Sequence, residues 1–190
     1  MAAIDKYKWL EFYKVKLKAD VYNTVVGKLV LRTVAEMGFL NGYNSELGAP
    51  PFERFYVGGT GLFGGRFDGR ELVALRGYEN ASSTGGTIDD ITPYGGATIY
   101  NRFAAELRYP ISMNQTAKIY ALTFLEGGNA WNSFGSYNPF QLKRSVGAGI
   151  RVYMGAFGLI GFDFAYGFDK TINGTEPAGS RTHFLMNQSL

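Results

Sequence analysis

The stretch Tyr13-Lys14-Val15-Lys16-Leu17-Lys18-Ala19-Asp20-Val21-Tyr22 decides the fold. Apolar side chains hold its odd positions, and lysines and an aspartate alternate with them from position 14 to position 20. Because successive side chains of a strand point to opposite faces, this period of two predicts a β-strand with one apolar and one charged face. The alternation is longer than an average soluble strand of about five or six residues. A long strand with a polar second face favours a barrel with a wet interior over a two-sheet sandwich.

Similar alternation returns along the rest of the chain. We expect a turn at Asn23-Thr24, followed by a second strand that carries Leu29, Leu31 and Phe39 on its apolar face. Further strands are predicted around residues 99–109, 119–126, 142–152, 160–168 and 183–190. The sequence therefore predicts an all-β fold, a transmembrane antiparallel β-barrel of which about seven or eight strands are present here.

The composition agrees with a barrel in a membrane. Aromatic residues make up 16% of the 190 residues, 26 residues are glycine, and mean hydropathy is only −0.09. A transmembrane helix is not expected, because no run approaches 18 consecutive apolar residues. A barrel strand needs only about 9–11 residues, half of them facing lipid, so its average hydropathy stays low.

Charge and cysteine content exclude several other classes. The chain has no cysteine, which excludes a disulfide scaffold, a thiol nucleophile and a cysteine-based zinc site. The formal net charge is +3, but lysine and arginine are interleaved along the strands instead of clustered on one face. We therefore expect no nucleic-acid partner.

Between residues 40 and 94 the alternation breaks down. This segment is rich in glycine and contains the pair Pro50-Pro51, yet it keeps apolar and aromatic islands such as Phe52 and Phe55. Such islands are not typical of a disordered linker, whereas a long structured loop is usually functional. We predict that loop 40–94 folds into the barrel lumen, with Leu75-Arg76-Gly77-Tyr78 as its central motif.

Arg76 needs acceptors if it enters the barrel, because a desolvated guanidinium without a partner is costly. The alternation places Glu106 and Glu126 on the inner faces of two consecutive strands, with Phe124 on the same face as Glu126. We predict that the two carboxylates and the ring hold Arg76 by ion pairing and a cation–π contact. Gly77 would let the backbone turn tightly against the wall.

Alternative sites are weaker. Glu106 and Glu126 could be the carboxylate pair of a glycosidase, but the sequence clusters no further catalytic groups around them. The run Gly59-Thr60-Gly61-Leu62-Phe63-Gly64 matches a dinucleotide-binding pattern without the helix that should follow it, and Asp89-Asp90 lacks the spaced ligands of a calcium loop. His183 is the single histidine and is interpreted as a polar lumen residue. We expect no catalytic residue, no cofactor and no metal.

Four segments resemble the Omp85 family. Leu75-Arg76-Gly77-Tyr78 and the upstream Pro51-Phe52-Glu53-Arg54-Phe55-Tyr56-Val57-Gly58-Gly59 resemble the signature blocks of the family's barrel-lining loop. The segments around Glu106 and from Phe124 to Trp131 are similar to the two strands after that loop. The resemblance implies the C-terminal half of a sixteen-stranded barrel in the bacterial outer membrane, with the loop arginine reaching acidic residues on those strands. Trp131 is expected to be an interfacial aromatic.

The resemblance implies a BamA-like factor that inserts and folds outer-membrane β-barrel proteins through a lateral gate. Its partners would be outer-membrane lipid, unfolded β-barrel substrates and accessory assembly-complex subunits. The gate strand would comprise His183, Phe184, Leu185, Met186, Asn187 and Gln188. The alternative within the family is polypeptide translocation by a two-partner-secretion or TamA-like transporter. A small barrel enzyme, such as a membrane protease or lipase, is a third hypothesis that would require a His/Ser/Asp constellation.

The chain departs from the family pattern in three places. The periplasmic POTRA domains and the first barrel strands do not occur in residues 1–190, about eleven extra residues at 60–70 separate the two loop blocks, and the last residue is Leu190 instead of an aromatic. No signal peptide is apparent at the start. We therefore expect the chain to be a fragment or a processed form.

Overall fold

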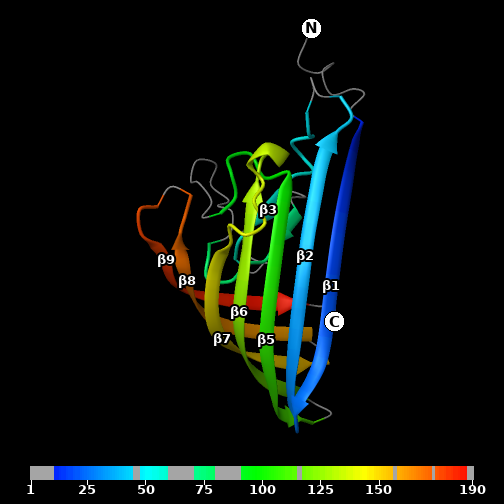
Figure 1. Cartoon of the computed structure of the whole chain (residues 1–190). Helices are drawn as coiled ribbons and strands as arrows, with labels where there is room; N and C mark the ends of the chain where they lie inside the picture. The colour runs from blue at the N-terminus through cyan, green and yellow to red at the C-terminus, as the bar shows by residue number, and fades with distance from the viewer. Residues whose placement is uncertain are drawn as a thin grey trace.

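The computed structural model describes residues 11–44, 48–59, 71–79, 91–114, 117–155, 158–172 and 174–187. The described residues form one seven-stranded antiparallel sheet in the order β1-β2-β5-β6-β7-β8-β9 (Figure 1). The prediction of an all-β antiparallel fold is therefore confirmed. The strands are β1 (Phe12–Val26), β2 (Leu29–Gly42), β5 (Ile99–Met113), β6 (Ala117–Trp131), β7 (Lys143–Met154), β8 (Gly158–Lys170) and β9 (Pro177–Asn187).

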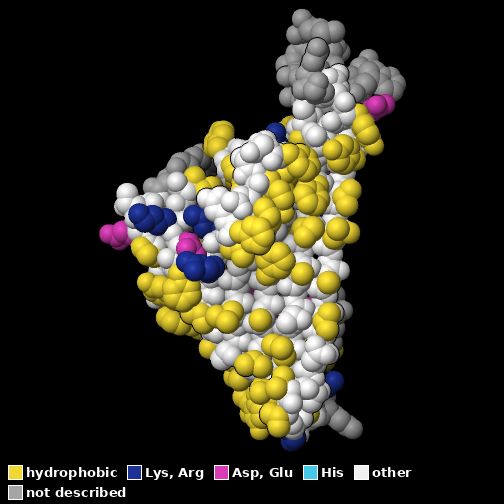
Figure 2. Space-filling view, viewed as in Figure 1, with side chains coloured by type: hydrophobic (Ala, Val, Ile, Leu, Met, Phe, Trp, Pro, Cys, Tyr) yellow, Lys and Arg dark blue, Asp and Glu magenta, His cyan; other side chains and the backbone are white. Residues whose placement is uncertain are grey.

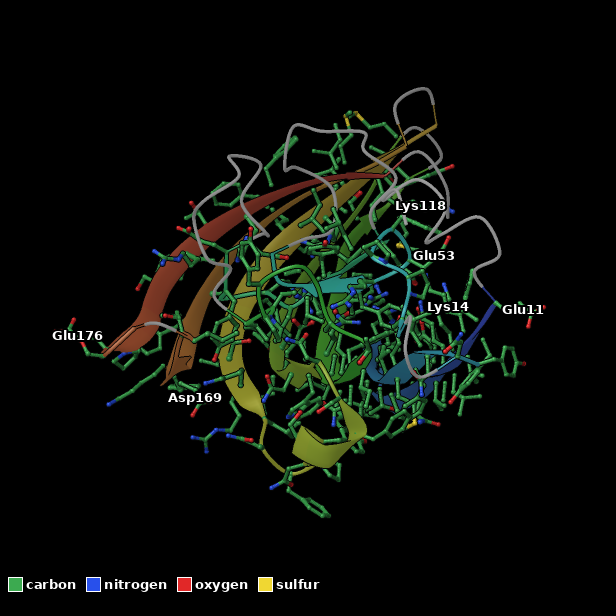
Figure 3. The ribbon with its side chains drawn as sticks, turned by 90° about the horizontal axis from the view of Figure 1, so that it is seen from above. Glu11, Lys14, Glu53, Lys118, Asp169 and Glu176 are labelled. Atoms are coloured by element: carbon green, nitrogen blue, oxygen red, sulfur yellow. The ribbon has the colours of Figure 1, made fainter. Side chains whose placement is uncertain are left out.

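The sheet is strongly curved. β1 and β2 stand on one side, and the strand directions turn steadily through β5, β6 and β7 until β9 runs across the back (Figure 1). Seen from above, the sheet forms an arc around the segment that holds β3 (Figure 3). This curvature follows from the right-handed twist of long strands and gives the sheet a convex and a concave face. Its two edge strands are β1 and β9.

The convex face is apolar. Figure 2 shows hydrophobic side chains spread over the visible face, with charged side chains grouped in its left part and at its two ends. Such a face of exposed side chains is unfavourable in water but matches a hydrocarbon environment. No helix among the described residues is long and apolar enough to cross a membrane. The exposed apolar side chains along these strands include Leu17, Val21, Phe103, Leu107, Tyr109, Ile111, Leu125, Val146, Ile150, Phe162, Phe164, Tyr166, Phe184 and Met186.

The first turn lies further along the chain than predicted. Asn23 and Thr24 remain in β1, where they pair with Leu31 and Val30 of β2. The chain turns instead at Gly27, whose φ of 55° is easily reached only by a residue without a Cβ. The expectation of a turn at Asn23-Thr24 was therefore wrong, because the strand propensity of the following valines outweighs the turn propensity of that pair.

The described parts of loop 40–94 pack on the concave face. They form the two parallel strands β3 (Phe55–Val57) and β4 (Glu71–Val73). The ring of Phe55 meets the ring of Tyr100 on β5 edge-on, with 4.7 Å between centroids. The loop and the wall thereby share one buried core, which comprises Leu40, Phe55, Val57, Val73, Leu75, Tyr78, Ile91, Ala97, Tyr100, Ala130 and Ala178.

Candidate functional site

The two sequence blocks of the loop are joined by backbone hydrogen bonds. The Gly58 N–H donates to the carbonyl of Val73, and the Gly59 N–H donates to the carbonyl of Tyr78, both at 2.9 Å. Gly77 has a φ of 89°, and a Cβ placed on it would lie 2.7 Å from Cβ of Ser145 on β7. Glycine is therefore required at this position both by the backbone conformation and by the close approach to the wall.

Arg76 is buried against the wall, with 4% of its surface exposed. Its Nη2 lies 2.6 Å from Oε1 of Glu126 and 2.5 Å from Oε1 of Glu106, and its Nε donates to Glu126 at 3.0 Å. The guanidinium carbon sits 3.6 Å from the ring centroid of Phe124. The structure thus brings together the four residues for which the sequence predicted a contact.

Strand register explains why these side chains meet. Glu106 on β5 lies directly opposite Phe124 on β6, and Glu126 is two residues further along the same face. Phe124 in turn lies opposite Gly147 on β7, where a Cβ would overlap the ring. The missing side chain at Gly147 leaves the space in which the ring lies flat under the guanidinium.

A third carboxylate reaches Arg76, and the sequence reasoning missed it. Asp163 on β8 is fully buried, and its Oδ2 lies 3.4 Å from Nη1 of Arg76. Arg151 on β7 holds the same carboxylate through two hydrogen bonds of 2.6 and 2.7 Å. Gly149 and Gly161 make room for these two side chains, since a Cβ at either position would overlap Asp163 or Arg151 respectively. The sequence did offer one sign of this role, because the alternation of β8 places Asp163 on the face opposite to its apolar side chains.

The charges around Arg76 form a balanced network. Arg102 contacts Glu126 at 2.8 Å, while Arg108 and Arg32 both reach Glu106. Compensation of this kind is needed because an unpaired charge in this environment would be strongly destabilising. The connected groups are five arginines, Arg32, Arg76, Arg102, Arg108 and Arg151, and five carboxylates, Asp20, Glu36, Glu106, Glu126 and Asp163.

Burial alone would lower the pKa of the Arg76 guanidinium, but the carboxylates of Glu126 and Glu106 outweigh it and raise this pKa. The arginine therefore stays charged at any physiological pH. The backbone takes part as well, because the Arg76 N–H donates to Oε2 of Glu126 at 2.9 Å. Glu126 consequently fixes both the side chain and the main chain of the loop tip.

His183 and Tyr78 extend the attachment to the remaining strands. Nε2 of His183 on β9 accepts a hydrogen bond from the Gly77 N–H at 2.9 Å, so this nitrogen carries no proton. The Tyr78 hydroxyl donates to the carbonyl of Arg144 on β7 at 2.7 Å. The motif from Leu75 to Tyr78 is thus bound to every strand from β5 to β9.

The other residues named for the last strand have different surroundings. Phe184 and Met186 are exposed on the convex face, and Leu185 is half-buried on the opposite side. β9 begins at Pro177, earlier than the predicted gate strand, and ends at Asn187. Gln188 lies outside the described residues, as do Asp89-Asp90 and positions 60–64 of the glycine pattern.

A second set of ion pairs fixes the loop to the opposite side of the sheet. Lys14 on β1 contacts Glu53 at 2.8 Å and Glu71 at 2.6 Å, and Lys16 contacts Glu71 at 2.8 Å (Figure 3 labels Lys14 and Glu53). Burial raises the pKa of the Glu71 carboxyl, but the two lysines outweigh this effect and lower it. The loop therefore bridges the concave face from β1 to β9.

The geometry defines a class of protein. A curved antiparallel sheet with an apolar convex face and a charged concave face, filled by a loop, is part of a transmembrane β-barrel. The Arg76 site within it holds the loop and the wall together. Among the described residues there is no cluster of three or more histidine, aspartate and glutamate side chains that could hold a metal ion.

The comparison with protein families extends this result. The Omp85 superfamily domain matches residues 5–189, and the chain belongs to this superfamily. Its members are outer-membrane proteins that insert or translocate other proteins. None of the curated proteins compared with the chain matches it.

Proposed function

We propose that this chain is the C-terminal part of a barrel that assembles β-barrel proteins in the bacterial outer membrane, without enzymatic chemistry. The observation that carries the proposal is the Arg76 network. It ties the loop to the carboxylates of three strands, Glu106 on β5, Glu126 on β6 and Asp163 on β8. The wall is thereby braced from inside, while β9 remains an edge strand of the described sheet.

An edge strand in lipid has a specific chemical consequence. Backbone N–H and C=O groups that face hydrocarbon without partners cost several kcal/mol each. An incoming strand removes this cost by pairing with the edge, which is the β-augmentation mode of recognition. In the proposed mechanism β9 acts as the lateral gate that templates the terminal strand of a substrate barrel.

β9 suits this role better than the other edge strand. β1 is fixed to the loop by the ion pairs of Lys14 and Lys16 with Glu53 and Glu71. On β9, His183 accepts one backbone hydrogen bond, and Arg181 lies a longer 3.5 Å from Glu79. The seam at β9 is therefore expected to open more readily than the seam at β1.

The proposal is tested by blocking the edge with a bulky maleimide label. The chain has no cysteine, so Thr182→Cys on β9 gives a single reactive thiol. Ala148→Cys is the matched control, because Ala148 and Thr182 both lie in register with Phe164 and Ala148 belongs to an interior strand. The protein is placed in liposomes, and folding of an unfolded β-barrel substrate is followed by its gel-mobility shift.

We expect the unlabelled protein to accelerate substrate folding relative to empty liposomes. Labelling the Thr182→Cys variant should remove most of this acceleration, and labelling the Ala148→Cys variant should leave it intact. Equal effects at the two positions would contradict the gate at β9. Passage of a soluble polypeptide into the vesicles, without accelerated folding, would instead support the translocation alternative.

A further inference from the structure

The connection between β6 and β7, residues 132–142, folds back over the convex face. The ring of Phe134 stacks on Phe39 of β2 with 5.8 Å between centroids, and Tyr137 packs edge-on against Trp131 at 4.9 Å. Figure 3 agrees, since the short helix η2 (Phe134–Ser136) lies outside the arc of the sheet, away from β3. Trp131, which the sequence predicts to be an interfacial aromatic, is only 6% exposed because Tyr137 of this connection packs against it.

Two buried amides hold the connection in place. Asn101 on β5 donates through Nδ2 to the carbonyl of Pro139 at 3.1 Å. Asn129 on β6 donates in the same way to the carbonyl of Gln141 at 2.7 Å. Both asparagines belong to the outward-facing positions of their strands, where a membrane-facing residue is normally apolar. Their amides are therefore used to fix the connection against the sheet.

The connection is built for an apolar environment. Residues 132–142 contain no charged side chain. Phe134 is half-exposed, and Phe140 is 90% exposed. Exposed aromatic side chains on an uncharged segment are typical of the interface between a membrane and water.

A groove of about 570 Å³ lies on the convex face across β1, β2, β5 and β6, beside the end of this connection. Its lining includes Ala35 on β2, Phe103 and Ala105 on β5, Leu125 on β6, and Leu142 at the end of the connection. One row of paired residues crosses its floor: Ala19, Ala35, Phe103, Gly127 and Arg144. Because most side chains of this row are small, the groove is hollow where the rest of the face carries bulky residues.

The groove ends at a basic group. Arg144 lines it, and 67% of its side chain is exposed. Lys143 lies beside it and donates to the carbonyl of Lys170, while Arg144 pairs with Asp169 at 2.9 Å. Two cations, Arg144 and Lys143, thus lie near one carboxylate, Asp169, at this end.

We propose that this groove binds one anionic phospholipid. An acyl chain lies along the floor of small residues beside Leu142, and the lipid phosphate lies at Arg144, near Lys143. The apolar lining matches the chain, and the excess positive charge at one end matches the phosphate. The inference rests on the membrane environment of the convex face and holds whether the barrel inserts or translocates proteins.

Photocrosslinking in vesicles tests this proposal. The probes are phosphatidylglycerol and phosphatidylcholine with the same diazirine-bearing acyl chain, each added at low fraction to phosphatidylcholine vesicles that contain the protein. Adducts are mapped by peptide mass spectrometry. We expect adducts on residues 103–105 and 142, at a yield about fivefold higher for phosphatidylglycerol.

Two variants separate the chain site from the phosphate site. Arg144→Gln should abolish the preference for phosphatidylglycerol, and Arg144→Lys should retain it. Ala105→Phe fills the groove and should suppress adducts there, whereas Ala148→Phe, on the same face outside the groove, should not. The gel-mobility shift of the folded protein confirms that each variant has folded.

Three results would overturn the proposal. Equal yields for the two lipids would remove the phosphate contact, and an unchanged preference in Arg144→Gln would do the same. Adducts spread evenly over the convex faces of β7 and β8 would show that the groove holds no lipid in particular. Crosslinks between two protein copies through residues 103–105 would assign the groove to a protein contact.

Discussion

Replacing Arg76 by alanine is expected to be the most damaging single substitution in the loop. The substitution removes the contacts of one guanidinium with Glu106, Glu126 and Asp163, together with its cation–π contact with Phe124. It leaves the buried network with one more negative than positive charge. The strands β5, β6 and β8 then lose their common link to the loop.

The magnitude follows from the burial of these groups. Removing one partner of a buried ion pair costs about 3–5 kcal/mol, because the remaining charges stay desolvated. Each carboxylate keeps at least one other arginine, which prevents a larger loss: Arg108 and Arg32 at Glu106, Arg102 at Glu126, and Arg151 at Asp163. We therefore expect Arg76→Ala to lower the free energy of unfolding by about 3–5 kcal/mol.

Urea unfolding of the purified protein in detergent micelles, followed by tryptophan fluorescence, measures this change. Arg144→Ala is the matched control, because Arg144 also pairs with a carboxylate but is largely exposed. Exposed pairs contribute little, so the control should unfold close to the unaltered protein. A loss for Arg76→Ala no larger than the loss for Arg144→Ala would refute the bracing role of the buried network.

Three further substitutions follow from the same geometry. Gly77→Ala should lower the free energy of unfolding by about 1–3 kcal/mol, and more than Gly95→Ala, since both glycines have positive φ but only Gly77 is crowded; equal losses in urea unfolding would exclude the close approach to Ser145. Asp163→Asn should destabilise the protein by about 3–5 kcal/mol through the loss of the Arg151 and Arg76 contacts, and a neutral result in the same assay would remove Asp163 from the site. Glu71→Gln should cost about 0.5–1 kcal/mol near neutral pH. Because the folded protein lowers the pKa of Glu71 below its ordinary 4.5, this contribution is present above that value and is lost as pH falls through the lowered pKa. A difference in the free energy of unfolding between Glu71→Gln and the unaltered protein that persists in acid would contradict the ion pairs with Lys14 and Lys16.

The strands, and the contacts of Arg76 with Glu106, Phe124 and Glu126, could be predicted from the sequence because they depend only on strand alternation and on the pairing of consecutive strands. A period of two assigns each side chain to a face, and consecutive strands usually pair. Glu106, Phe124 and Glu126 satisfy both conditions, so their meeting with a loop arginine could be predicted. The number of strands in the main sheet followed from the same alternation.

Asp163 could not be placed in this way. Its alternation assigns it to the inner face, but β8 is the third strand from β5, and only the curvature of the sheet brings it to the loop tip. Curvature depends on twist and on the glycines of the inner face, including Gly147, Gly149 and Gly161, and has no simple signal in the hydrophobic period. For the same reason the accepting role of His183 was not foreseen.

Trp131 shows a second limit of the sequence pattern. Its position in the alternation assigns it to the convex face, and that assignment is compatible with its contact with Tyr137. The pattern does not reveal that the connection after β6 folds back and covers this face. That fold-back depends on Asn101 and Asn129, whose polar side chains break the apolar alternation and were the available signal.

Site-specific crosslinking to a substrate tests the central claim most directly, namely that a braced wall leaves β9 free to pair with an incoming strand. A cysteine in the terminal strand of an unfolded β-barrel substrate is combined with Thr182→Cys or with Ala148→Cys, with and without Arg76→Ala. We expect a disulfide at position 182, none at position 148, and a clear loss of the position-182 product when Arg76 is removed. Equal yields at the two positions, or a yield at position 182 that does not depend on Arg76, would contradict the account.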